Sequence, residues 1–270
     1  MSTDVRIGIV GAGGRMGRAL VREIGGTDGC MVAGASERPG APVLGQDAGA
    51  MAGIGSIEVK IHDDPLALFA GCDAVIDFTS PSVTAHHASL AAQGKTIYIV
   101  GTTGLEAEQF DALRKAAAHT AIVQAYNMSV GVNLLAGLVR QVATQLGPDW
   151  DIEIVEMHHR LKVDAPSGTA ILFGEAAARG RGIDLAQHSE RGRDGITGAR
   201  QKGSIGFASL RGGNVVGDHS VIFAAENERI ELSHKASDRT IFARGAVRAA
   251  LWARSAAPGL YGMADVLGLN

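Results

Sequence analysis

The sequence predicts an α/β fold: a doubly wound parallel sheet joined to a second, α+β domain that carries a mixed sheet. Short apolar runs of strand length alternate with helical patterns over the first 127 residues, as in a parallel sheet covered on both faces. A glycine-rich turn joins the first such run to the first helical pattern. From residue 128 the pattern changes to one long helical segment and then short strands separated by turns, which indicates antiparallel or mixed pairing.

In the first part, continuous apolar runs predict strands at Val5–Val10, Met31–Ser36, Ala74–Phe78, Thr96–Val100 and Ala121–Gln124. Apolar residues at helical spacing predict helices at Met16–Ile24, at Pro65–Ala70 with Asp63 or Asp64 as the cap, at Ser82–Gln93 and at Ala107–His119. Helices between consecutive strands supply the crossovers that parallel pairing needs.

In the second part, Val130–Leu146 is a helical pattern ended by Gly147-Pro148, and Ile152–His158 alternates as a strand does. A helix capped by Ser167 is expected over Ser167–Ala178, and the polar stretch Gln187–Gly203 is expected to be a loop. Three further strands are expected at Ile205–Arg211, Val215–Ala224 and Arg229–His234, and Arg239–Arg254 is expected to be the last helix.

Composition narrows the classes of function. With 46% hydrophobic residues and a net charge of −3, the chain lacks the basic field that nucleic-acid binding needs. The N-terminus has no secretory pattern, and no apolar stretch is long enough to span a membrane, so neither a nucleic acid nor a membrane is an expected partner. The two cysteines, Cys30 and Cys72, read as small buried hydrophobes, which fits a reducing cytoplasm.

The glycine-rich turn predicts a dinucleotide site. Its spacing is Gly11-x-x-Gly14-x-x-Gly17, between an expected strand and an expected helix. Glycines let pyrophosphate oxygens approach the amides at the start of that helix. Glu37 ends the second expected strand, where an acid binds ribose hydroxyls, and the guanidinium of Arg38 suits a 2′-phosphate, so NADH and NADPH both remain open.

Two further turns are expected at the carboxyl edge of the same sheet, where ligands bind in such folds. They are Phe78-Thr79-Ser80-Pro81 and Gly101-Thr102-Thr103-Gly104, and each offers amides and hydroxyls to a nicotinamide carboxamide. Simple strand-to-helix turns explain these local sequences equally well.

The segment Glu156–Ala170 gathers imidazole, guanidinium and ammonium groups just before an expected helix that opens with Ser167-Gly168-Thr169. The free amides of a helix start, with cations beside them, form a carboxylate site. The imidazole of a histidine can also deliver a proton near neutral pH. A solvated charged loop with Ser167 as a plain cap is the alternative interpretation.

Metal binding and serine hydrolysis have less support in this segment. His158 and His159 are neighbours on an expected strand, so they point to opposite faces, and the flanking cations repel a divalent ion. No metal is therefore expected. Ser167 lacks the G-x-S-x-G elbow of a hydrolase nucleophile.

Taken together, these motifs resemble the 4-hydroxy-tetrahydrodipicolinate reductase family, formerly called dihydrodipicolinate reductases, of the diaminopimelate pathway of lysine biosynthesis. The resemblance covers essentially the whole chain. It is carried by Gly11–Gly17, Glu37-Arg38, Phe78-Thr79, Gly101–Gly104, Asn127–Ser129, His158-His159-Arg160-x-Lys162-x-Asp164-Ala165-Pro166-Ser167-Gly168-Thr169, Gly206, Arg211-Gly212-Gly213, Gly217-x-His219, His234-Lys235-Ala236 and Phe242-Ala243-x-Gly245-Ala246.

The resemblance implies a Rossmann-type dinucleotide-binding domain over residues 1–127 plus 240–270. It implies a substrate-binding and oligomerisation domain over 128–239, and a homotetramer. It also implies that NADH or NADPH gives a hydride to an unsaturated cyclic imine dicarboxylate, which yields tetrahydrodipicolinate.

The resemblance also implies roles for single residues. His158 corresponds to the proton donor and Lys162 to the second catalytic position, while the substrate-binding positions correspond to His159, Ser167, Gly168 and Thr169. The implied cofactor contacts are Gly11, Ala12, Gly13, Gly14, Arg15, Met16, Glu37, Arg38, Gly101, Thr102, Thr103, Ala125, Tyr126, Asn127 and Met128. The family usually has Phe at position 128 and a small residue or proline at position 126, so packing beside the nicotinamide is expected to differ.

Two other functions share part of this pattern. A semialdehyde dehydrogenase also has two domains, but its chemistry needs an activated cysteine, and neither Cys30 nor Cys72 stands at a plausible position. A protein that senses dinucleotides without chemistry would share the glycine motif, but it leaves the cationic segment around His158 unexplained.

Overall fold

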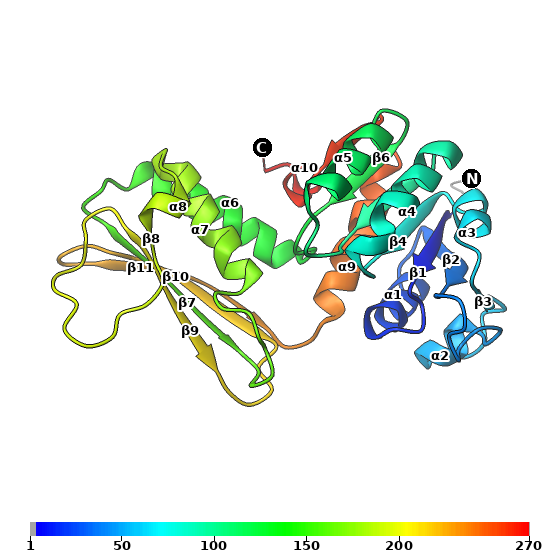
Figure 1. Cartoon of the computed structure of the whole chain (residues 1–270), viewed down its shortest axis with the longest axis horizontal. Coiled ribbons are helices and arrows are strands. Elements are labelled where there is room, and N and C mark those ends of the chain that lie inside the picture. Colours follow the sequence, from blue (N-terminus) through cyan, green and yellow to red (C-terminus); the bar gives the residue numbers. More distant parts are fainter. Residues whose placement is uncertain (1–3, 270) are drawn as a thin grey trace. The chain divides into compact units, whose positions relative to one another are not determined.

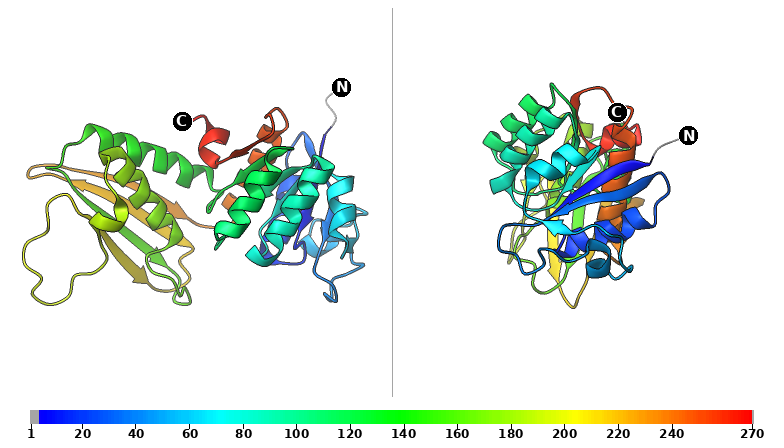
Figure 2. Two further views of the ribbon diagram at one scale, coloured as in Figure 1. Left: turned by 45° about the horizontal axis from the view of Figure 1, so that its top comes forward. Right: turned by 90° about the vertical axis from the view of Figure 1, so that its right-hand side faces the viewer.

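The structure is a computed structural model that describes residues 4–269. Within that range the chain forms two units (Figures 1 and 2). Unit 1 extends to Val130 and resumes at Arg239–Gly268, and unit 2 comprises Gly131–Asp238 with Leu269. These boundaries differ by a few residues from those expected, and the roles expected for the two parts remain predictions.

Unit 1 is built on a parallel sheet that, in the described chain, has seven strands in the order β12-β6-β5-β4-β1-β2-β3. The chain runs outward from β1 through β2 to β3 and then returns to β4 on the other side of β1, so the strand order reverses beside β1. The strands are β1 (Val5–Val10), β2 (Cys30–Ser36), β3 (Ile61–His62), β4 (Ala74–Asp77), β5 (Ile97–Val100), β6 (Ala121–Gln124) and β12 (Gly259–Tyr261).

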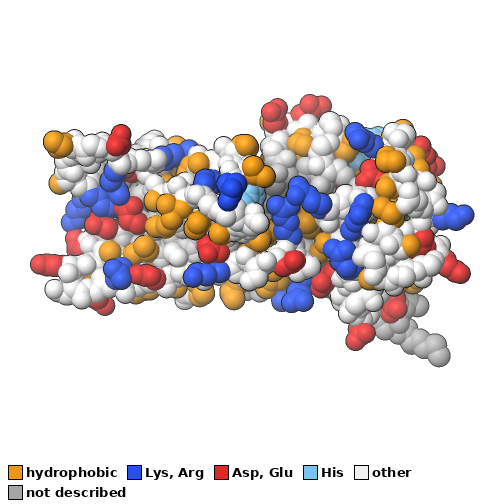
Figure 3. Space-filling model, turned by 90° about the horizontal axis from the view of Figure 1, so that it is seen from below, with side chains coloured by type: hydrophobic (Ala, Val, Ile, Leu, Met, Phe, Trp, Pro, Cys, Tyr) orange, Lys and Arg blue, Asp and Glu red, His pale blue; other side chains and the backbone are white. Residues whose placement is uncertain are grey.

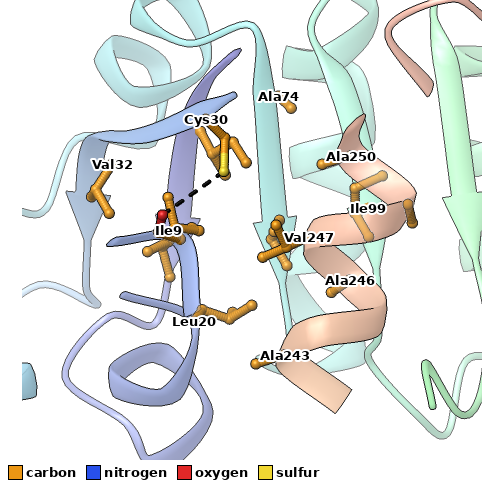
Figure 4. Close-up of a cluster of buried hydrophobic side chains, with 14 of the residues drawn as sticks. Ile9, Leu20, Cys30, Val32, Ala74, Ile99, Ala243, Ala246, Val247 and Ala250 are labelled. Carbon is orange, nitrogen blue, oxygen red and sulfur yellow. Dashed lines mark hydrogen bonds between the residues drawn. The ribbon is translucent and has the colours of Figure 1, made fainter. Parts of the chain in front are cut away.

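Helices cover both faces of this sheet (Figure 1). Side chains alternate along β4, so Ala74 and Ile76 enter one hydrophobic cluster while Val75 enters the other. Figure 4 shows the first cluster, in which alanines of α9 let that helix approach the sheet closely. The helices are α1 (Arg15–Gly25), α2 (Ala48–Ala52), α3 (Pro65–Gly71), α4 (Pro81–Gly94), α5 (Ala107–Ala116), α9 (Thr240–Ala253) and α10 (Met263–Leu267).

Unit 2 is a mixed sheet with helices on one face. In the part of the chain that the structure covers, its strand order is β11-β10-β7-β9-β8. β7 and β9 are parallel, whereas β10 is antiparallel to both β7 and β11. Its strands and helices are α6 (Val130–Gln145), β7 (Asp151–His158), α7 (Gly168–Arg181), α8 (Leu185–His188), β8 (Ser189–Glu190), β9 (Ile205–Arg211), β10 (Gly217–Ala224) and β11 (Arg229–Ala236).

The helices α6 and α7 bury Ile154, Phe173 and Phe223 against one face of that sheet. Alternation leaves Val155, Met157 and Leu210 on the opposite face, where Leu210 is 50% exposed. The left-hand part of Figure 3 shows hydrophobic side chains gathered among charged ones on one face of unit 2.

The predicted fold class is confirmed, and the main strands and helices begin and end within a few residues of their expected positions. Two expectations at the level of elements need correction, and two short elements were missed. Arg239–Arg254 is not the last helix, because β12 and α10 follow it. The expected loop Gln187–Gly203 contains the end of α8 and the strand β8. The short α2 and β3 were not predicted, since elements of five and two residues are too short to show a period.

Among residues 4–269, no helix combines the length and the hydrophobicity that crossing a membrane requires. Cytoplasmic localisation stays a prediction.

Candidate active site

The glycine-rich turn of unit 1 leaves backbone groups open at the start of α1. Gly11 has a φ of +72°, and a Cβ there would lie 2.8 Å from Cγ2 of Thr79. A Cβ on Gly17 would collide with the carbonyl of Gly11 and the backbone of Ala12. The N-cap of α1 is Gly14, so no side chain covers the first amides of the helix. This cradle fits a pyrophosphate, because side chains would fill the space that its oxygens need.

Glu37 lies directly over this turn. A Cβ on Gly13 would be 3.3 Å from Oε1 of Glu37, and Oε2 accepts a hydrogen bond from the backbone amide of Arg38 at 3.1 Å. Arg38, the next residue, is exposed. A carboxylate beside the glycine turn fits ribose hydroxyls, and the guanidinium of Arg38 fits a phosphate on that ribose.

Beneath the neighbouring loops lies a fully buried carboxylate, that of Asp77 at the end of β4. It accepts hydrogen bonds from the amide and hydroxyl of Thr79 at 2.8 and 2.6 Å and from the hydroxyl of Tyr98 at 2.7 Å. Nδ1 of His87 lies 2.8 Å away. Burial alone would raise the pKa of Asp77, but these hydrogen bonds and the nearby His87 lower it. The carboxylate therefore fixes the loop that follows β4.

The remaining predicted cofactor residues follow β5 and β6 at the same edge of the sheet. Gly101 packs against the ring of Phe78, and a Cβ there would collide with that ring. Tyr126 is 54% exposed and its ring contacts Phe110 edge-on. Met128, in contrast, has no exposed surface and belongs to the hydrophobic core of unit 1. Its side chain is therefore closed off from solvent, unlike that of Tyr126.

In unit 2, His158 ends β7 and Glu156 stands two residues before it on the same face. Nδ1 of His158 is 2.6 Å from Oε2 of Glu156. Arg211 at the end of β9 donates to both carboxylate oxygens of Glu156, at 2.8 and 2.9 Å. Burial would raise the pKa of Glu156, but hydrogen bonds from Arg211, His158 and Ser209 lower it to about 2. Glu156 is therefore ionised at neutral pH.

The pKa of His158 is lowered, chiefly by burial, and the nearby cations Lys162 and Arg211 lower it further while Glu156 opposes the shift. The loop after β7 brings those cations together. Nζ of Lys162 donates to both carboxylate oxygens of Asp164 at 2.7 and 2.8 Å, and Arg211 donates to the carbonyl of Asp164 at 2.7 Å. The loop that carries Lys162 is thus tied to β9.

The helix α7 begins at this cluster. Oγ of Ser167 caps it by accepting from the amide of Ala170 at 3.1 Å, and the amide of Ser167 donates to Oε1 of Glu156 at 3.2 Å. Oγ of Ser167 also lies 2.9 Å from Nε2 of His219. Burial, and then the nearby His158, lower the pKa of His219 to about 3, so its ring is neutral at physiological pH.

The structure thus brings His158, Lys162 and Ser167 together through shared contacts, with the half-buried His159 directly after His158 and with Gly168 and Thr169 at the start of α7. Sequence reasoning gave no role to Glu156, Arg211 or His219. Glu156 could have been found from its two-residue spacing to His158, which puts both side chains on one face of a strand. Arg211 and His219 come from strands far along the sequence, so only the sheet register reveals them.

Within residues 4–269, no three His, Cys, Asp or Glu side chains are grouped so that they could hold a metal ion.

The strand order of unit 1 and its glycine turn define a class, the proteins with a Rossmann-type dinucleotide-binding fold. A solved structure described as a probable dehydrogenase from Thermotoga maritima shares the fold, with a TM-score of 0.64 at 12% identity over 98% of this chain and 93% of that one. A dipicolinate-bound dihydrodipicolinate reductase from Paenisporosarcina sp. TG-14 matches with a TM-score of 0.78 at 23% identity over 97% of this chain and 99% of that one.

Sequence comparison places the chain within this class. Profiles described as dihydrodipicolinate reductase, N-terminus and C-terminus, match residues 5–128 and 131–267. The 4-hydroxy-tetrahydrodipicolinate reductases of Methylocella silvestris and Brucella abortus are 61% and 60% identical to this chain, over 99% and 97% of it and 98% of each relative. The chain belongs to the dihydrodipicolinate reductase family, and the resemblance of its motifs to that family is confirmed.

Proposed function

We propose that this protein reduces an unsaturated cyclic imine dicarboxylate to tetrahydrodipicolinate with NADH or NADPH, in the diaminopimelate pathway of lysine biosynthesis. The observation that carries the proposal is the cluster of His158, Lys162 and the N-terminus of α7, which combines a proton donor with groups that attract carboxylates. Family membership supports the same reaction.

We assign cofactor binding to unit 1. The amides of Gly11–Met16 hold the pyrophosphate, Glu37 accepts hydrogen bonds from ribose hydroxyls, and Arg38 pairs with a 2′-phosphate when NADPH is used. The Gly101–Thr103 and Ala125–Met128 segments border the nicotinamide. When bound, the reduced nicotinamide supplies the hydride.

We assign substrate binding to unit 2. His159, Ser167, Gly168 and Thr169 hold the carboxylates at the start of α7, where helix amides and the helix dipole favour negative charge. Lys162 places a fixed cation beside those carboxylates. His158 gives a proton to the ring carbon next to the one that receives the hydride, so that one carbon–carbon double bond is reduced.

The direct test replaces the two proposed catalytic side chains. His158→Ala and Lys162→Ala should each lower kcat on the order of 10²–10⁴-fold while the Kd for NADH and NADPH hardly changes. Lys202→Ala is the matched control, because Lys202 pairs with Asp149 in the same unit and its side chain is 70% exposed. Turnover at the wild-type rate in either alanine variant would remove that residue from the mechanism.

Pyridine-2,6-dicarboxylate, a planar mimic of the substrate, separates the reductase from a protein that only senses dinucleotides. A reductase should be inhibited by it and should show a raised Tm in its presence, because a ligand that binds the folded state stabilises it. If the compound neither inhibits the oxidation of NADPH nor shifts the Tm, unit 2 loses its proposed role.

The cofactor preference can be resolved by changing one side chain. Arg38→Ala should raise the KM for NADPH more than the KM for NADH, because only NADPH carries the 2′-phosphate. Steady-state assays with each cofactor measure this difference. Equal effects on both KM values would remove Arg38 as the phosphate partner.

We further propose a homotetramer that assembles through the face of the unit 2 sheet opposite α6 and α7. That face carries Val155, Met157 and the half-exposed Leu210, and homo-oligomers commonly bury such faces. Leu210→Asp should lower the mass measured by light scattering. An unchanged tetramer in that variant would move the interface elsewhere, and a monomeric wild-type protein would end the proposal.

A further inference from the structure

We propose that Glu156, clamped by Arg211, is a positioning residue that holds the ring of His158 so that Nδ1 keeps its proton and Nε2 serves the substrate. The inference rests on the proposed function, since it matters only if His158 is the proton donor. It deepens that function by assigning which nitrogen carries the transferred proton and which side chains determine its pKa.

Several hydrogen-bond donors converge on the buried carboxylate of Glu156. Glu156 is 1% exposed, and it accepts from the side chains of His158 and Arg211 and from the backbone amide of Ser167. Those donors belong to β7, β9 and the N-cap of α7, which are the three elements that meet at the proposed substrate site. Glu156 therefore fixes the separate parts of that site relative to one another.

The ionised carboxylate of Glu156 determines which nitrogen of His158 carries the proton. A carboxylate whose pKa lies at about 2 is ionised at neutral pH and can only accept hydrogen bonds. The nitrogen 2.6 Å from it, Nδ1 of His158, must therefore be the protonated one. Neutral His158 is then free to accept at Nε2, and protonated His158 has its available proton there. Hydrolase triads use a buried carboxylate in the same way to hold a catalytic histidine in one tautomer.

The other ring nitrogen of His158, Nε2, has space beside it. Among residues 4–269, no hydrogen bond is formed by Nε2 of His158, although the side chain is only 11% exposed. Gly217 on β10 borders this nitrogen, and a Cβ there would lie 3.0 Å from it. The missing side chain at Gly217 thus leaves room beside Nε2, while the opposite side of the ring is held by Glu156.

The charges around His158 give the inference a direction that can be tested. Glu156 from β7 favours the protonated ring, whereas Lys162 from the loop and Arg211 from β9 disfavour it. His219 from β10 lies edge-on with ring centroids 5.0 Å apart, and Ser167 from α7 is uncharged. Because burial already lowers the pKa of His158, the carboxylate is the group that keeps a proton available on the ring.

The decisive variant is Glu156→Gln, which keeps the shape and one acceptor oxygen but removes the charge. The pKa of His158 should fall, so the alkaline limb of kcat against pH should move to lower pH by about one unit or more. At neutral pH kcat should drop about tenfold for each unit of that shift, while the KM for substrate changes only a few-fold. A pH profile identical to that of the wild type would overturn the inference.

Arg211→Gln should move the same limb in the opposite direction. Removing the guanidinium leaves the carboxylate uncompensated, so it favours protonated His158 more strongly. If Glu156 and Arg211 served stability alone, the Tm of both variants would fall and the alkaline limb of kcat would shift in neither variant. The pair keeps the test usable even if one variant folds poorly, and shifts of the same sign in both variants would contradict the inference.

Glu153→Gln is the matched control. Glu153 lies on the same strand and points to the opposite face, and it too is ion-paired, with two arginines, Arg193 and Arg200, where Glu156 has one. This variant, with its assembly state checked, should keep the wild-type kcat and pH profile. If it shifts the profile as Glu156→Gln does, the effect is general electrostatics and the positioning role fails.

The tautomer of His158 can also be read without turnover. Nitrogen-15 NMR of the imidazole should show a proton on Nδ1 in the wild-type protein and a mixture of tautomers in Glu156→Gln. An Nε2-protonated ring in the wild type would overturn the inference. The two proposals fail separately: full activity in His158→Ala removes the proposed function of that residue, whereas an inactive His158→Ala with an unshifted Glu156→Gln profile removes only the positioning role.

Discussion

In each unit, within the described residues, a buried carboxylate at or near the end of a strand has the Nδ1 atom of a histidine set against it. Asp77 follows this pattern in unit 1 with His87, and Glu156 follows it in unit 2 with His158. Their other partners differ. Asp77 is surrounded by buried or locally held donors, the hydroxyls of Thr79 and Tyr98, whereas Glu156 is held by the guanidinium of Arg211 beside an exposed loop.

The difference shows how one arrangement can serve architecture or chemistry. His87 and Tyr98, two of the partners of Asp77, have almost no exposed surface, so their hydrogen bonds to the carboxylate stay in place. Burial, and then the charge and hydrogen bond of Asp77, raise the pKa of Tyr98 well above its usual value, so it remains a donor. In unit 2 the histidine has one nitrogen held and one free, which is what a proton donor needs.

Asp77→Ala should produce the largest effect on stability. It removes the acceptor of several buried donors at once, and the loss of one partner from a buried charged network costs about 3–5 kcal/mol in the free energy of unfolding. Urea unfolding measures the loss. The KM for the cofactor should rise because Thr79 is released, while kcat of the folded fraction stays within a few-fold.

Asp111→Ala is the control for that change, because Asp111 forms an exposed ion pair with Arg114 in the same unit. An exposed pair contributes about 1 kcal/mol or less. If folded Asp77→Ala loses turnover as severely as His158→Ala, the hydrogen bonds around Asp77 take part in the reaction. Asp77 and Glu156 would then no longer differ in role.

A smaller effect on the free energy of unfolding, when counted per pH unit, is expected from His219, which is neutral in the folded protein at physiological pH. Its folded pKa of about 3 lies below the ordinary 6.5, so between these values the unfolded chain binds a proton that the folded chain does not. Stability from this group is complete above pH 6.5 and falls by about 1.4 kcal/mol for each pH unit below it. His219→Gln should show a flatter loss of the free energy of unfolding over that range.

Urea unfolding at several pH values compares the two slopes. His158 and His234 also have pKa values lowered mainly by burial, and both are present in the two proteins, so the difference in slope reports His219 alone. Equal slopes would mean that His219 is protonated in the folded protein. The side chains around Glu156 would then include a second charged imidazole beside that of His158.

The sequence predicted the main elements of both units but not the side chains that surround the two buried carboxylates. Period and turn chemistry predicted the sheet of unit 1, since five of its strands are continuous apolar runs, and they predicted the cap at Ser167. The resemblance to the family supplied the roles of His158 and Lys162. Neither supplied the two carboxylate networks, because Tyr98 reads as a strand residue and Arg211 lies far along the chain, and only strand pairing brings them to Asp77 and Glu156.

Tyr98→Phe is the mildest test of the contrast. It deletes one hydroxyl that donates to Asp77 at 2.7 Å and keeps the edge-on contact of the ring with Phe69. Losing a hydrogen bond to a charged acceptor should lower the free energy of unfolding by about 1.5 kcal/mol. The pH profile of kcat should not move. In the wild-type protein the hydroxyl of Tyr98 keeps its proton, so that proton takes no part in turnover.

Tyr261→Phe provides the comparison for that hydroxyl, since its partner is the uncharged carbonyl of Ala257 at 3.0 Å. Its partly exposed bond should contribute about 0.5 kcal/mol, well below the loss at Tyr98. The ratio of the two losses then measures how strongly the buried charge of Asp77 binds its donors. A loss at Tyr98 no larger than that at Tyr261 would mean that Asp77 does not hold its negative charge, and the architectural interpretation of unit 1 would fail at its central residue.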